Sequence, residues 1–88
     1  MTLKKQIQLI RRTACLSLTT RSKSALRLDE IAGLFCPSIS IDDRAIAFIK
    51  HEVEAIIQAR IEGQSPEQIK ALVQKLIANR AANKGAAL

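Results

Sequence analysis

The chain has 88 residues, enough for one small domain. It is 48% hydrophobic but only 2% aromatic, with three Gly and two Pro residues, which excludes a turn-rich β-sandwich and favours an aliphatic core between helices. The formal net charge is +6. No apolar run approaches the ~18 residues of a membrane span and no secretory signal is recognisable, so we expect a cytoplasmic protein without a transmembrane segment.

The positive charge is concentrated at the N-terminus. All charged residues in the first 28 positions are basic, which gives this segment +7, whereas the remaining 60 residues hold seven basic and eight acidic side chains and carry −1. The basic residues are Lys4, Lys5, Arg11, Arg12, Arg21, Lys23 and Arg27. A local field of this kind attracts phosphates, anionic lipids or acidic protein surfaces without distinguishing among them. We therefore predict a basic patch that binds a partner.

Residues 3–17 have the pattern of an amphipathic basic helix. Leu3, Ile7, Ile10 and Ala14 share one side of a helical wheel, and the Lys and Arg side chains occupy the other. Solvated helix faces usually mix charges of both signs, whereas this face has no carboxylate. The polar, hydroxyl-rich residues 19–24 are typical of a linker. A second interpretation of this acid-free segment is a mitochondrial transit peptide.

A short helix is predicted over residues 25–35, ended by a Cys-Pro pair because the residue before a proline avoids the α region. Residues 28–35 resemble the first helix of a helix-turn-helix motif. The continuation departs from that motif, because Asp42 and Asp43 would stand at the start of the helix that enters the major groove and would repel phosphate. The sequence therefore gives only weak support to base recognition by this segment.

A long helix is predicted over residues 41–62, starting at a capping box of Ser40 and Asp43 and stopping at Gly63. Its apolar arc covers about half of the circumference, which is wider than packing on one neighbour requires. We therefore expect it to pack on a second helix of this chain and on a partner, which we take to be a second copy or another protein. The expected interface residues are Ile46, Ile49, Val53, Ile57 and Ile61.

The sharpest helix start in the chain is Ser65-Pro66-Glu67-Gln68, with an N-cap serine, a proline at the first helical position and a glutamine that completes a capping box. This helix is predicted to reach residue 82, with a fraying tail over residues 83–88. Two residues separate it from the preceding helix, which predicts an antiparallel αα-hairpin over residues 40–82.

The residue inventory offers little for catalysis or metal binding. His51, the lone histidine, lies on the predicted polar side of the long helix, and no Gly-rich loop follows a strand. Cys15 and Cys36 lack the spacing of a zinc site, so we expect reduced, buried thiols. We predict no catalytic residues, no metal, no cofactor and no small-molecule substrate, and hence no enzyme.

Together these patterns predict an all-α fold: one four-helix domain over residues 1–88, with a basic helix and linker in residues 1–28, forming a homodimer. The favoured function is a small regulatory protein that acts by protein–protein binding, for example an anti-activator or adaptor that occupies a helical or dimerisation surface of a transcription regulator. The alternative is a nucleic-acid-binding regulator that uses the basic N-terminal third.

Overall fold

The structure is a computed structural model that describes residues 8–87, with side chains for residues 8–80. In chain order the elements are strand β1 (Leu9–Ile10), helices α1 (Arg12–Thr19) and α2 (Lys23–Ala32), strands β2 (Ile39–Ser40) and β3 (Ile46–Ile49), and helices α3 (Lys50–Ile61) and α4 (Pro66–Ala87). The described residues thus combine four helices with a small antiparallel sheet of strand order β1-β3-β2. The all-α prediction is wrong, and the fold is mixed.

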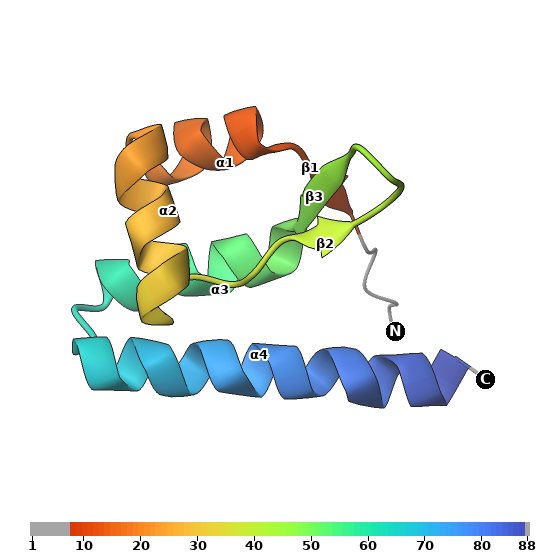
Figure 1. The fold of residues 1–88 in the computed structure, drawn as a ribbon. Coiled ribbons are helices and arrows are strands. Elements are labelled where there is room, and N and C mark those ends of the chain that lie inside the picture. The colour runs from red at the N-terminus through yellow and green to blue at the C-terminus, as the bar shows by residue number, and fades with distance from the viewer. Residues whose placement is uncertain (1–7, 88) are drawn as a thin grey trace.

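The helices are arranged in two parts (Figure 1). Helix α1 leads through a tight turn into α2, which runs in a clearly different direction toward α4. Helices α3 and α4 run antiparallel to each other and form a helical hairpin, as their short connection predicts. The three strands lie at the end of the molecule opposite α2, where β3 continues directly into α3.

The helix predicted over residues 41–62 is wrong in its first part. Residues 46–49 form β3, which pairs with β1 through Leu9 opposite Ile49 and with β2 through Ile39 opposite Ala47. The predicted Ser40 and Asp43 capping box does not form. Instead, the Asp42 carboxylate accepts the backbone N–H groups of Arg44 and Ala45, each at 2.9 Å, and closes the turn between β2 and β3. The helix itself starts only at Lys50.

The N-terminal prediction also needs correction. The first residues of the helix expected over 3–17 lie outside the described part, and within it Leu9 and Ile10 are in β1. The expected linker 19–24 is instead a turn at residues 20–22, because the Ser22 hydroxyl accepts the N–H of Ala25 at 3.1 Å and caps α2. Helix α2 ends at Gly33, whose φ of +80° suits glycine, before the predicted Cys-Pro stop is reached.

One hydrophobic core joins the elements. It contains both aromatic residues, Phe35 after α2 and Phe48 on β3, whose ring centroids lie 5.8 Å apart in a tilted arrangement. Leu26 of α2 and Val53 and Ile56 of α3 are fully buried beside them, and Ile69, Val73 and Leu76 of α4 complete the cluster. Through Phe48, strand β3 is therefore part of the same core as helices α2, α3 and α4.

A buried ion pair fixes α4 to the rest of the fold. The Glu52 carboxylate of α3 is 1% exposed and accepts the Arg80 Nε–H at 2.7 Å, with a second, shorter contact from Arg80 Nη2. Arg80 Nη2 also donates to the Pro37 carbonyl at 2.8 Å. The hydrogen bond with Glu52 raises the pKa of Arg80. Glu52 follows His51 on the side of α3 that was predicted to be polar, so this side is partly buried.

The two cysteines are free and buried, as predicted. Burial is the main cause that raises the pKa of Cys15 from 9.0 to about 11, against the opposing field of Arg12. Burial, with the nearby Glu52 carboxylate, raises the pKa of Cys36 from 9.0 to about 12. At neutral pH these thiols act as small apolar core groups.

The capping box at Ser65 is confirmed. The backbone N–H of Gln68 donates to the Ser65 hydroxyl at 3.2 Å, and the Ser65 N–H donates to the Gln68 side chain at 2.8 Å. Gly63, with a φ of +77°, separates α3 from this start. Helix α4 then spans 22 residues to Ala87, past the predicted end at residue 82. Across the described residues, no helix combines the length and apolar character needed to cross a membrane.

Replacing Ser65 by Ala should lower the free energy of unfolding by about 1 kcal/mol, the usual loss for an N-cap. Urea denaturation followed by circular dichroism should show a lower midpoint and an unchanged slope. Ser24→Ala, at an exposed position inside α2, serves as the control and should cause no loss. Equal midpoints for wild type and Ser65→Ala would show that the cap does not contribute.

The free energy of unfolding should decrease at alkaline pH. Because the folded thiols have raised pKa values, their contribution is fully present below pH 9.0, the unfolded value, and is lost as pH rises toward 11 and 12. The expected loss is about 1 kcal/mol per thiol between roughly pH 8 and 10. Cys36→Ala should show a smaller decrease than wild type over this range. The same decrease in both proteins would contradict the thiol origin.

Candidate nucleic-acid interface

The turn between α1 and α2 is built from hydroxyl residues and one unusual backbone conformation. Thr20 has a φ of +59°, in the left-handed region that β-branched residues rarely adopt and that costs about 1–2 kcal/mol. The Thr19 hydroxyl donates to the Cys15 carbonyl at 2.7 Å and accepts the Arg21 N–H at 3.3 Å. With the Ser22 cap, these contacts hold a sharp helix-turn-helix connection.

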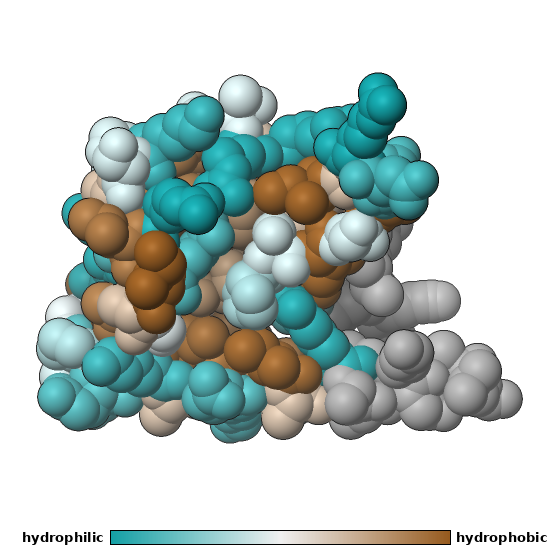
Figure 2. Space-filling model, viewed as in Figure 1, coloured by the Kyte–Doolittle hydropathy of each residue, from teal (hydrophilic) through white to brown (hydrophobic). Residues whose placement is uncertain are grey.

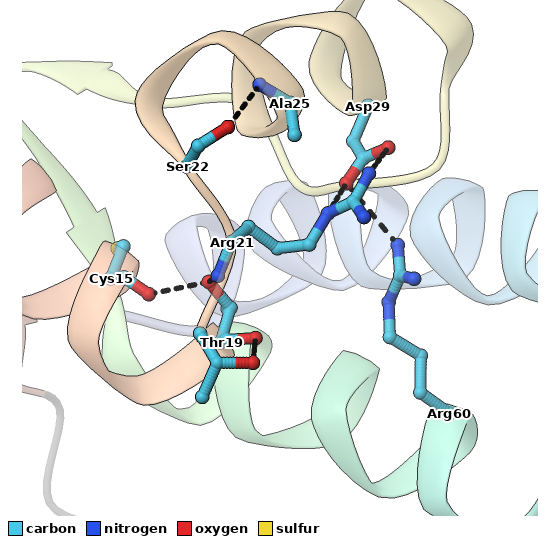
Figure 3. Close-up of polar contacts among 8 residues, drawn as sticks. Cys15, Thr19, Arg21, Ser22, Ala25, Asp29 and Arg60 are labelled. Carbon is cyan, nitrogen blue, oxygen red and sulfur yellow. Dashed lines mark hydrogen bonds and ion pairs between the residues drawn. The ribbon is translucent and has the colours of Figure 1, made fainter.

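Asp29 ties α2 to two other parts of the fold (Figure 3). Its carboxylate accepts Nε–H and Nη2–H of Arg21, each at 3.0 Å, so the turn residue grips it with two parallel bonds. Arg60 of α3 donates to the same carboxylate at 3.4 Å. Asp29 is only 6% exposed, and the two arginines compensate its buried charge.

Glu30, the other acidic residue of α2, is also paired. Its carboxylate accepts Nη1–H of Arg12 at 3.0 Å, and the Arg12 guanidinium lies over the Phe48 ring, 5.2 Å from its centroid. Helix α2 has no further Asp or Glu residue. Both of its carboxylates are thus held by arginines, and neither contributes an unpaired negative charge to the surface.

The outward side of α2 is cationic at its start and apolar further along. Lys23, Ser24 and Arg27 are exposed in the first turns. Leu28 and Ile31 follow, with exposed fractions of 65% and 73%, unusually high for large apolar side chains. Figure 2 shows apolar side chains exposed over this helix.

An open hollow lies between the start of α1 and the turn that joins β2 to β3. Its lining brings together two segments far apart in the sequence and includes three arginines. The lining residues are Arg11, Arg12, Thr13, Arg44, Ala45 and Ile46. Arg44 had no place in the predicted basic patch, because no local pattern connects it to residues 11 and 12.

The predicted basic patch is only partly a surface feature. Lys4 and Lys5 lie outside the described residues. The exposed members without an ion pair in the described structure are Arg11, Lys23 and Arg27, whereas Arg12 and Arg21 are engaged by Glu30 and Asp29. Neither pairing is visible in the sequence, because each joins helices or turns that meet only in the folded chain.

The predicted interface residues do not share one face. Val53 is fully buried in the chain's own core, and Ile57 packs against that core. Ile46 and Ile49 belong to β3, the former exposed at the hollow and the latter half-buried. Ile61, at the end of α3, is 73% exposed. Residues 41–62 therefore do not form the single long helix whose wide apolar arc was expected.

The chain matches no protein-family model, no curated protein and no solved structure. Within residues 8–80, His, Cys, Asp and Glu side chains form no group of three that could hold a metal ion. The geometry of the helix-turn-helix and of the hollow is therefore the basis for any functional conclusion.

Replacing Asp29 by Asn should lower the free energy of unfolding by about 1–2 kcal/mol. Breaking a fully buried ion pair costs about 3–5 kcal/mol, and the loss is smaller here because the Arg21 and Arg60 side chains are 40% and 38% exposed. Chemical denaturation measures the effect. The control Asp43→Asn removes the same charge from an exposed turn and should change stability by less than about 0.5 kcal/mol. Equal effects of the two substitutions would mean that the Asp29 contacts contribute nothing specific.

Proposed function

We propose that this protein is a nucleic-acid-binding regulator whose α1, turn and α2 form a helix-turn-helix, with α2 lying in the major groove of duplex DNA. The observation that carries this proposal is the outward side of α2, where Lys23, Ser24 and Arg27 are exposed at the start of the helix and no carboxylate is unpaired. In helix-turn-helix proteins, the N-terminal residues of the second helix contact base edges.

The sequence-based objection to this function rested on a different assignment of the helices. It placed Asp42 and Asp43 at the start of the recognition helix, where they would repel phosphate. In the fold these residues lie in the turn between β2 and β3, and our proposal assigns the role of second helix to α2, which starts at Lys23. The proposed motif, α1 and α2, therefore contains neither Asp42 nor Asp43.

The side chains on α2 have chemistry suited to DNA. Arginine makes paired hydrogen bonds to the O6 and N7 atoms of guanine, a role available to Arg27. Lys23 and Ser24, at the start of the helix, suit contacts to phosphate or base edges. The exposed Leu28 suits contact with a thymine methyl group, which would remove its apolar side chain from water.

A second candidate function is the protein–protein binding that the sequence favoured: a regulator that occupies a surface of a transcription factor. Its support is the exposure of three large apolar residues, Leu28, Ile31 and Ile61. Arg60, next to Ile61 in α3, reaches Asp29 of α2 at 3.4 Å, which links the end of α3 to the helix that carries Leu28 and Ile31. Contiguous exposed apolar groups are typical of protein-binding surfaces.

Binding of short random-sequence duplex DNA across a salt series tests the first candidate. The two exposed cations at the start of α2, Lys23 and Arg27, would contribute about −1.8 to the log–log slope if each neutralises one phosphate, at roughly 0.9 per contact. Lys23→Ala/Arg27→Ala should reduce the magnitude of this slope by about 1.8 and weaken binding at every salt concentration.

The matched control is Lys70→Ala/Lys75→Ala, which removes the same charge from exposed positions on α4. It should bind nearly as well as wild type. Equal losses in the two double variants would show attraction by net charge alone and would contradict a helix-turn-helix. No duplex binding by wild type, together with binding to a transcription regulator that Ile61→Ser weakens, would favour the second candidate.

A further inference from the structure

The hollow between α1 and the β2–β3 turn combines cationic groups from two segments of the chain. Arg11 and Arg44 are exposed, and neither forms an ion pair in the described structure. Arg12, the third arginine of the lining, is held in place by Glu30 and by the Phe48 ring. The lining therefore contains two guanidinium groups without an ion pair and one that is fixed, and an anion there would reduce the repulsion among these like charges.

One wall of the hollow is apolar. Ala45 and Ile46 line it, and Ile46 is 39% exposed at the start of β3. A site for a free inorganic anion has no need of such a wall. The sugar-phosphate backbone presents an anionic phosphate beside the C–H groups of a deoxyribose, and this combination matches arginines beside an exposed aliphatic side chain.

One ion pair links the lining of the hollow to α2. Lys23, Arg27 and Glu30 occupy positions i, i+4 and i+7, so they lie along one stripe of the helix. Arg12 is bonded to Glu30 at the end of that stripe. The Arg12–Glu30 pair therefore connects the lining of the hollow to the stripe of α2 that begins with Lys23 and Arg27.

Two carboxylates lie near the hollow in the β2–β3 turn. Asp42 accepts the backbone N–H groups of Arg44 and Ala45, each at 2.9 Å, and its charge is directed into its own turn. Asp43 is exposed and is the acidic neighbour that an anion would meet. The two exposed arginines and the backbone dipoles of the first turn of α1, which has no acidic residue, oppose the repulsion between Asp43 and an anion.

We infer that the hollow seats one backbone phosphate of the bound duplex, gripped by Arg11 and Arg44, with the adjoining deoxyribose against Ile46. This inference rests on the proposed function and adds a second point of contact to it. The strand that passes along Lys23 and Arg27 of α2 is anchored at the hollow, and the anchor sets the position of α2 in the groove. Contacts to phosphate of this kind position a protein on DNA and carry no sequence information of their own.

The test is the salt dependence of binding to a random-sequence duplex for Arg11→Ala, Arg44→Ala and the double variant. If the two arginines share one phosphate, the double variant reduces the magnitude of the log–log slope by about 0.9, and neither single variant changes it by more. Because both side chains are exposed, these variants should fold like wild type, which circular dichroism and urea denaturation check. Lys70→Ala/Lys75→Ala is again the matched control.

Three results would overturn the inference. A slope change of about 1.8 in the double variant would mean that the arginines neutralise separate phosphates. An unchanged slope, with binding still weakened by Lys23→Ala/Arg27→Ala, would remove the hollow from the interface and leave the proposed function standing. No duplex binding by wild type, even with inorganic phosphate shifting the amide resonances of Arg11 and Arg44, would reject the backbone assignment and the proposed function together.

Discussion

The position of α2 depends on the buried carboxylate of Asp29. Apolar packing through Leu26 is not directional and would allow the helix to rotate about its axis. The paired bonds from Arg21 and the third from Arg60 are directional, and they connect the turn, α2 and α3 at a single group. The contacts of Asp29 therefore determine which side chains of α2 face outward. The cationic start of the helix becomes a surface because Asp29 faces inward.

Glu52 has the corresponding role at the other side of the core. Through Arg80 it connects α3 to α4, and Arg80 also donates to the Pro37 carbonyl in the segment that follows α2. Replacing a buried ion pair by apolar residues is often neutral or stabilising, so such a pair is a poor explanation of stability alone. We interpret both carboxylates as devices that select one arrangement of aliphatic helices. With only two aromatic residues, the core contains few large rigid groups that could do the same.

Local signals in the sequence predicted the elements that local chemistry determines. The cap at Ser65 and the break at Gly63 are decided within a few residues, and both were found where expected. Residues 46–49 were assigned to a helix because their apolar side chains fit its period. They are also β-branched or aromatic at three of four positions, which suits a strand. Pairing with Leu9 and Ile10 favours the strand over the helix. Because these two residues are distant in the sequence, no local pattern contains this information.

The candidate site shows the same division between local and long-range information. The excess of positive charge in the first third was visible in the sequence, but its distribution on the surface was not. Arg12 and Arg21 are neutralised by the carboxylates of α2, and Arg44 supplies a cation from the turn between β2 and β3. A count of charges therefore overestimates the contribution of the N-terminal segment and omits a distant arginine. Because the acidic residues of α2 are used internally, a segment that contains both signs of charge still presents an outward face with positive groups alone.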